Sequence, residues 1–162
     1  MRWKIVAFVA VVVAAAFLVP QSAVAPTVSA EAAWELVVLG VAQDAGIPHL
    51  GCQQALCVSI RNGERPPERV ASIGLLNRVL NKAYLFDATP DFRSQVHSLS
   101  GGRPPDGIFL THAHIGHYTG LMYLGRESID APAVPVYGTE RMGEFLRGNA
   151  PWSLLVTRRN IE

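Results

Sequence analysis

Residues 111–118 read Thr-His-Ala-His-Ile-Gly-His-Tyr. This segment places His112, His114 and His117, three of the five histidines of the chain, within six residues. The residues before it, 105–110, form a turn and a short apolar run that predicts a buried strand, and the residues after it can open a helix. We therefore expect the histidines on a loop at the end of a strand, where a rigid scaffold commonly holds functional side chains.

Three imidazole rings so close in sequence predict a metal site. Imidazole is a good ligand for zinc and similar divalent ions, and a zinc site usually needs three or four ligands. His112 and His114 are two residues apart and can point to the same side of an extended segment. His117 can return to that side if the loop curls into a helical turn, which Gly116 allows. Three surface histidines by chance are the alternative, but their position after a buried strand favours metal binding.

The first 30 residues are expected to be a signal peptide. Arg2 and Lys4 make a basic start, and residues 5–19 form an unbroken apolar run. This run is shorter than the roughly 20 residues that a membrane-spanning helix needs. Small residues in an A-x-A pattern follow, so we expect cleavage before Glu31. The mature segment, residues 31–162, would then be periplasmic or secreted; the alternative is a chain anchored in the membrane by an uncleaved signal.

The mature segment is near neutral in charge and large enough for one domain. Removing Arg2 and Lys4 with the signal peptide leaves 12 basic side chains against 13 acidic ones. The sequence has no basic stripe and no internal repeat, so we expect no nucleic-acid partner, and no membrane contact after signal cleavage. A small-molecule substrate is expected, and the oligomeric state is left open.

Apolar runs and turn signals predict strands and helices in alternation. Strands are expected at residues 34–43, 70–76, 83–87, 105–110, 135–138 and 152–157, and helices from caps at Thr89 and Thr139 to about Ser98 and Arg147. The first strand has almost no polar interruption, which predicts burial on both faces. Residues 44–57 mix Gly, Pro, Asp and His with both cysteines and are expected to form a long loop. This order of elements predicts an α/β layered domain.

The histidine segment resembles the H-x-H-x-D-H motif of the metallo-β-lactamase superfamily. Both leading histidines and the last one match, whereas Gly116 stands where the motif has aspartate. Residues 39–57 resemble the first strand and the glycine-rich, cysteine-bearing loop of the branch that holds the PQQ-biosynthesis B proteins and related cyclic phosphodiesterases. Residues 85–95 resemble the D-A-x-P-D-x-R-x-Q segment of the same branch. The resemblance thus covers nearly all of the mature segment.

The resemblance implies an αββα sandwich built from two similar halves, of which this chain would hold the first. His112 and His114 would bind a first zinc together with a histidine further downstream, while His117 and the motif's aspartate would serve a second. Because Gly116 has no side chain that could bind a metal, we expect one well-held zinc or a second site completed by another group. Asp44 is a conceivable substitute, although an acid in a loop is more often a turn residue.

The function implied is that of an exported zinc-dependent hydrolase, in which metal-bound hydroxide attacks an ester, amide or phosphodiester. Asp87 and Asp91 are candidates to orient the metal ligands, although a strand-end turn and a helix cap would explain them equally well. The alternative function is a non-hydrolytic cofactor-biosynthesis accessory or binding protein, similar to the PQQ-biosynthesis B proteins, and Gly116 favours it. An iron-dependent redox enzyme with the same ligands is a third hypothesis.

Cys52 and Cys57 allow three interpretations. The related phosphodiesterases use cysteines of this loop for a structural zinc, and His49 could supply a third ligand here. An oxidising compartment equally permits a disulfide between the two cysteines. Two buried free thiols are the third interpretation.

Overall fold

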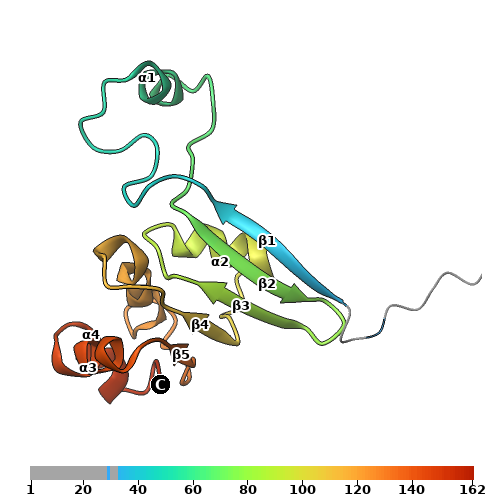
Figure 1. Ribbon diagram of the computed structural model, residues 1–162, viewed down its shortest axis with the longest axis vertical. Helices are drawn as coiled ribbons and strands as arrows, with labels where there is room; N and C mark the ends of the chain where they lie inside the picture. Colours follow the sequence, from blue (N-terminus) through green and yellow to red (C-terminus); the bar gives the residue numbers. More distant parts are fainter. Residues whose placement is uncertain (1–28, 30–32) are drawn as a thin grey trace, which may run out of the picture.

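Five strands form one sheet in the order β1-β2-β3-β4-β5, and helices pack on one of its faces (Figure 1). The computed structural model describes Ser29 and residues 33–162, so the predicted signal peptide, apart from Ser29, lies outside the described residues. In chain order the elements are β1 (Trp34–Gly40), α1 (Ala55–Arg61), β2 (Ser72–Asn77), β3 (Lys82–Phe86), α2 (Phe92–Ser100), β4 (Gly107–Phe109), the 3₁₀ helices η2 (Ile115–His117) and η3 (Thr119–Leu124), β5 (Val136–Tyr137), α3 (Glu140–Gly148) and α4 (Trp152–Thr157). Within the described part of the chain, no helix is both long and apolar enough to cross a membrane.

The sheet is mixed, as an α/β domain of this kind requires. β1, β2 and β3 pair antiparallel, whereas β4 joins β3 and β5 joins β4 in parallel. The predicted pairing of the second and third strands is confirmed: Asn77 lies opposite Lys82, and the Asn77 side chain accepts a hydrogen bond from the Leu80 backbone N–H (2.9 Å). Because β3, β4 and β5 are parallel, their carboxyl ends meet at one edge of the sheet, and the segments that follow them lie close together there.

The hydrophobic core lies between the sheet and the helices. Leu85 of β3 and Ile108 of β4 are fully buried in one cluster with Leu121 and Leu124 of η3. α2 packs on the three antiparallel strands and on η3. The approach of α2 to the sheet is close, because a Cβ atom on Gly74 would lie 2.5 Å from a methyl carbon of Leu99. Burial of this apolar surface stabilises the face of the sheet that supports the histidine loop.

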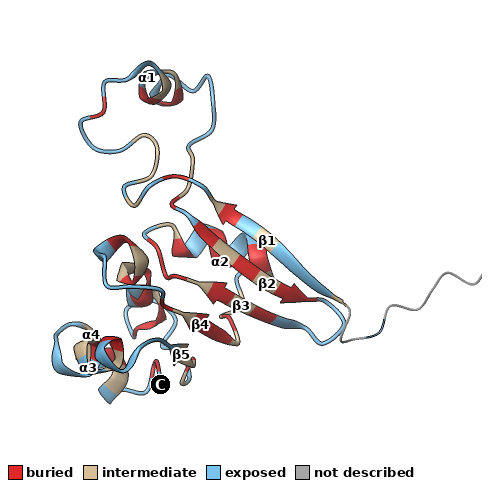
Figure 2. Ribbon diagram, viewed as in Figure 1, coloured by how far each residue is buried: buried red, intermediate tan, exposed pale blue. Residues whose placement is uncertain are grey.

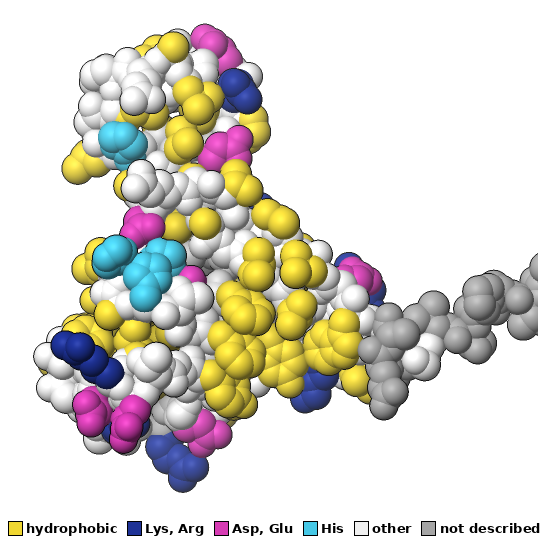
Figure 3. Space-filling view, in the orientation of Figure 1, with side chains coloured by type: hydrophobic (Ala, Val, Ile, Leu, Met, Phe, Trp, Pro, Cys, Tyr) yellow, Lys and Arg dark blue, Asp and Glu magenta, His cyan; other side chains and the backbone are white. Residues whose placement is uncertain are grey.

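The opposite face of the sheet is apolar and open in this chain (Figure 3). A hollow on it is lined by Trp34, Leu75, Tyr84, Phe86 and Phe109. The prediction that the first strand is buried on both faces is therefore wrong for the described residues: Leu36 and Val38 are 63% and 62% exposed. Figure 2 shows β1 exposed along much of its length, and of its apolar side chains Leu39 lies in the core with Val37 packed against it. The physical reason is that helices cover only one face of the sheet.

Two segments differ from the predicted secondary structure. Residues 152–157 form helix α4 rather than a strand. Trp152, Leu155 and Val156 follow helical spacing and pack on the core, while Leu154 points to solvent. A short apolar run does not distinguish a strand from a helix by itself, and the position of its buried side chains decides here. The second difference is α1, which begins inside the region predicted as a loop.

The remaining two helices begin close to their predicted positions. Thr139 caps α3, as expected. α2 begins at Phe92 rather than directly after Thr89, because Asp91 takes the cap position. The Thr89 hydroxyl accepts a hydrogen bond from the Asp91 backbone N–H (3.1 Å) and donates one to the buried Gln95 side chain (2.7 Å). Thr89 thus orders the turn that precedes the helix.

Residues 41–71 leave the sheet between β1 and β2 as an arm that carries α1 (Figure 1). Backbone hydrogen bonds close the base of the arm, where Ile47 and Glu68 each donate to the carbonyl of the other (3.0 and 2.8 Å). Asp44 lies in a tight turn at this base. The arm therefore returns to the edge of the sheet where the parallel strands end, and it brings a carboxylate with it.

Candidate metal centre

The histidine loop begins where β4 ends, and the neighbouring strand β3 fixes its first residue. Asp87 follows β3, and its Oδ1 accepts hydrogen bonds from the Thr111 backbone N–H (2.8 Å) and hydroxyl (2.9 Å). The loop then curls into η2, where the His117 N–H donates to the His114 carbonyl (2.9 Å). This is the helical turn that the sequence required to return the third histidine to the side of the first two.

The three imidazole rings gather at one place on the surface (Figure 3). The His112 ring centroid lies 4.0 Å from that of His117 and 4.6 Å from that of His114. In residues 33–162 no three His, Cys, Asp or Glu side chains converge with the geometry of a metal site. The donor set itself, three imidazoles with carboxylates beside them, is one that divalent zinc favours.

His117 is held from both sides by carboxylates. Its Nδ1 lies 2.8 Å from Asp87 Oδ2, and its Nε2 lies 3.1 Å from Asp44 Oδ1. The side chains of His117 and Asp87 are only 12% and 9% exposed, whereas that of Asp44 is 42% exposed. A carboxylate that accepts the Nδ1 proton fixes the imidazole tautomer and leaves Nε2 as the nitrogen that can bind a metal.

The two carboxylates predicted to orient the ligands lie in different places. Asp87 contacts His117 directly, as described above. Asp91 instead stands at the N-cap position of α2 without a side-chain cap hydrogen bond, and its Oδ2 accepts a hydrogen bond from the Val70 backbone N–H (2.8 Å). The structure thus brings Asp87 to the histidines and gives Asp91 a part in fastening the arm to the helix.

Gly116 is buried, and Asp44 occupies the space in front of it. A Cβ atom on Gly116 would lie 2.7 Å from Asp44 Cβ and 3.0 Å from Asp44 Cγ. The two residues of the Asp44–His117 pair are 73 positions apart in sequence. Sequence reasoning named Asp44 only as a conceivable substitute, because no local signal reports that the arm folds back onto the histidine loop.

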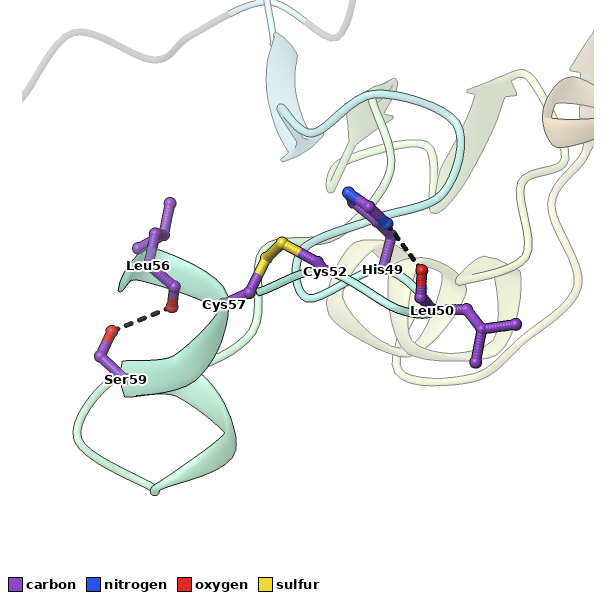
Figure 4. The surroundings of a disulfide bond; sticks show 6 residues. All are labelled: His49, Leu50, Cys52, Leu56, Cys57 and Ser59. Atoms are coloured by element: carbon purple, nitrogen blue, oxygen red, sulfur yellow. Dashed lines mark hydrogen bonds between the residues drawn. A yellow bond between two sulfur atoms is a disulfide. The ribbon is translucent and has the colours of Figure 1, made fainter. Parts of the chain in front are cut away.

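The two cysteines lie in the arm and not in the histidine loop (Figure 4). Cys52 and Cys57 form a disulfide with a Cα–Cα distance of 6.0 Å. Of the three interpretations of these cysteines, the structure therefore has the disulfide. His49 does not join them, and its Nδ1 lies 3.0 Å from the Leu50 carbonyl oxygen. The disulfide ties the start of α1 to the loop that follows Asp44.

A hollow of about 380 Å³ opens beside the histidine loop. Its walls are Leu110, Thr111, His112, Ala113, Thr139, Arg141, Met142 and Phe145, contributed by the loop and by α3. Arg141 is exposed, and none of the ion pairs among the described residues involves it. The candidate centre thus has a neighbouring hollow lined in part by an arginine that makes no ion pair among the described residues.

Known proteins match this chain in sequence and in fold. A family model described as a beta-lactamase superfamily domain matches residues 82–159, which include the histidine loop. Coenzyme PQQ synthesis protein B of Ruegeria pomeroyi is 26% identical over 138 residues, which cover 78% of this chain and 45% of that protein. An octanoyltransferase of Porphyromonas gingivalis is 33% identical over 85 residues, 52% of this chain and 16% of that protein.

Two solved structures share the fold. Zn²⁺-bound PqqB from Methylobacterium extorquens superposes with a TM-score of 0.63 at 22% identity, covering 74% of this chain and 45% of that one. A diphosphatase from the PhnP family superposes with a TM-score of 0.58 at 28% identity, covering 80% and 48%. This chain spans less than half the length of each of these four proteins. Over the part that it spans, the chain thus has the metallo-β-lactamase fold, and its histidine loop lies within the segment that matches a beta-lactamase superfamily domain.

Proposed function

We propose that the intact protein is an exported, zinc-dependent hydrolase whose histidine loop holds the metal. The observation that carries this proposal is the gathering of His112, His114 and His117 at the end of β4, with the last ring fixed by Asp87. Imidazole nitrogens are ligands that catalytic zinc commonly uses, and a catalytic zinc site keeps one position for water; His112 and His114 would serve a first ion and His117 a second. Zinc bound there would lower the pKa of its water to about 7, so that hydroxide would be available at neutral pH to attack an ester, amide or phosphodiester.

Contacts within the chain position the histidine loop and its rings. Asp87 accepts the Thr111 N–H and so fixes where the loop starts. The same carboxylate holds His117 through Nδ1, which leaves Nε2 beside Asp44 and the ring next to that of His112. The neighbouring hollow leaves room for a substrate beside His112. Positioning of this kind matters because small displacements of a reacting group lower the rate strongly.

Arg141 favours a phosphodiester or another anionic substrate among the three classes. Arg141 lines the hollow beside the histidine loop, and its guanidinium has no ion-pair partner among the described residues. Guanidinium groups bind phosphate oxygens through two parallel hydrogen bonds. The similarity in fold to a diphosphatase from the PhnP family also supports a phosphate-containing substrate.

The test is metal analysis and hydrolysis with the intact protein. Zinc content is measured by mass spectrometry, and turnover is measured on bis-p-nitrophenyl phosphate and on p-nitrophenyl acetate, for the wild type and for His114→Ala. Bound zinc with phosphodiester turnover that His114→Ala abolishes is the expected result. Bound zinc without turnover of any substrate class would favour the non-hydrolytic accessory role, and bound iron would favour redox chemistry.

Export has its own test. The protein is expressed with its complete N-terminus, and the periplasmic fraction is examined by N-terminal sequencing. A periplasmic protein that begins at Glu31 is the expected result. A full-length protein retained in the membrane fraction would show an uncleaved anchor instead.

A further inference from the structure

Asp44 stands in an unusual relation to the histidine loop. It comes from the arm, yet its carboxylate meets the ring of His117 at 3.1 Å on the side that Asp87 leaves free. The residue next to His117 in sequence, Gly116, has no side chain and is buried under Asp44. The space beside His117 is therefore filled by a carboxylate that arrives from a distant part of the chain.

The separation of the two polar atoms suits two ligands of one metal ion. With metal–ligand bonds of about 2.0 to 2.1 Å, neighbouring ligand atoms lie about 2.9 Å apart at a right angle and about 3.4 Å apart in a tetrahedral site. The observed distance of 3.1 Å between His117 Nε2 and Asp44 Oδ1 lies between these values and equals that of a direct hydrogen bond, so a metal ion can replace the proton between the two atoms without a large movement of either side chain. Asp44 is also 42% exposed, so its carboxylate has lone pairs free for a metal.

A purely structural role explains less of the geometry. Asp87 already fixes the orientation of His117 through Nδ1, so a second carboxylate is not needed to hold the ring. The Asp44 side chain is 42% exposed, so solvent screens its contact with His117 and reduces what the contact adds to folding stability. A carboxylate and an imidazole nitrogen placed side by side are, by contrast, two of the ligand types that zinc binds.

We propose that Asp44, which comes from the arm, is a metal ligand that shares one ion with His117. Its carboxylate would take the place of the aspartate that the family motif has at the position of Gly116. This inference rests on the proposed function for the presence of a metal, and it assigns the ligand. It also explains Gly116: a side chain there would collide with Asp44, since the added Cβ would lie 2.7 Å from Asp44 Cβ. A carboxylate can therefore stand at position 44 or at position 116, but not at both.

The first experiment measures zinc binding to the metal-free intact protein by calorimetry. Asp44→Asn keeps an oxygen that accepts a hydrogen bond from His117 but removes the anionic ligand. We expect its zinc affinity at the His117 site to fall by about a hundredfold or more, beyond what loss of a supporting hydrogen bond usually causes. Glu68→Gln, which removes one negative charge from the same arm, should bind zinc as the wild type does.

The second experiment moves the carboxylate. Gly116→Asp alone should destabilise the protein, because both carboxylates cannot fit. Gly116→Asp combined with Asp44→Gly should recover the fold and restore zinc binding to within about tenfold of the wild type, as expected for two strongly coupled positions. Cobalt substitution gives an independent readout, since the visible spectrum of bound Co²⁺ should change in Asp44→Asn and return in the exchanged variant.

The outcomes separate the two proposals. Zinc binding and a cobalt spectrum unchanged by Asp44→Asn would overturn the assignment of Asp44 and leave the metal-dependent function standing. A wild-type protein that binds no zinc, cobalt or other divalent metal would overturn both. An exchanged variant that folds but does not recover metal binding would also contradict the assignment.

Discussion

Asp87 offers a prediction in which stability and metal binding should respond differently. Its carboxylate accepts three hydrogen bonds: from the Thr111 N–H (2.8 Å), from the Thr111 hydroxyl (2.9 Å) and from His117 Nδ1 (2.8 Å). The residue is 6% exposed and has a φ of +64°, a conformation that Asp and Asn adopt more easily than other side chains. We therefore compare Asp87→Asn, which fits the backbone, with Asp87→Ala, which does not.

The expected sizes follow from these contacts. In Asp87→Asn the amide oxygen still accepts the Thr111 N–H, so the free energy of unfolding should fall by only about 1 kcal/mol. In Asp87→Ala the Thr111 N–H and the His117 ring lose their acceptor in a buried place, and the positive φ adds about 1 kcal/mol of strain. The free energy of unfolding should then fall by about 3 to 5 kcal/mol in total.

Zinc affinity, unlike stability, should fall clearly in Asp87→Asn. The amide of Asp87→Asn donates a hydrogen bond to His117 Nδ1, so the ring must carry its proton on Nε2, the nitrogen that would bind the metal. Zinc affinity should fall about tenfold to hundredfold although the fold is nearly intact. Urea unfolding of the metal-free protein and a zinc titration measure the two quantities. Wild-type zinc affinity in Asp87→Asn, or wild-type stability in Asp87→Ala, would refute this reasoning.

Three further predictions follow from other contacts. Burial raises the pKa of Asp106, but hydrogen bonds from Lys82 and Arg103 outweigh this effect and lower the pKa to about 2. The free energy of unfolding should therefore fall by about 2 kcal/mol as the pH falls from 4 to 2, and acid unfolding curves of Asp106→Asn should lack this loss. Cys52→Ser opens a short disulfide loop and should destabilise the arm by roughly 2 kcal/mol, seen as faster hydrogen exchange there while exchange in the sheet is unchanged. Arg141→Gln should raise KM about tenfold for a phosphodiester and leave KM for a neutral ester unchanged, and equal effects on both would remove Arg141 from substrate binding.

Local sequence patterns were sufficient to predict most of the sheet. The apolar runs around residues 72–77 and 82–86 are joined by a turn that only a hairpin accommodates, and they pair as expected. The strand before the histidines is buried through Ile108, and the curl of the loop followed from the spacing of the histidines. These features depend on neighbours in sequence, which is why the sequence reports them.

Features that depend on distant contacts could not be predicted. The run from Trp152 to Thr157 is too short for its periodicity to separate helix from strand, and packing of Leu155 against the core decides in favour of a helix. Likewise, the meaning of Gly116 depends on Asp44, which only the closed base of the arm brings near. On sequence alone Gly116 favoured a non-hydrolytic protein on the same fold, and metal binding by Asp44, as proposed, would answer that argument.

The central claim is that the histidine loop of the intact protein binds zinc. Crystals of the protein grown with zinc, measured on both sides of the zinc absorption edge, locate the metal directly. The expected result is an anomalous peak about 2.0 to 2.1 Å from imidazole nitrogens of the loop, with the Nδ1 of His117 still bonded to Asp87. A map with no peak at His112, His114 or His117, or with its zinc at another place in the protein, would contradict the claim.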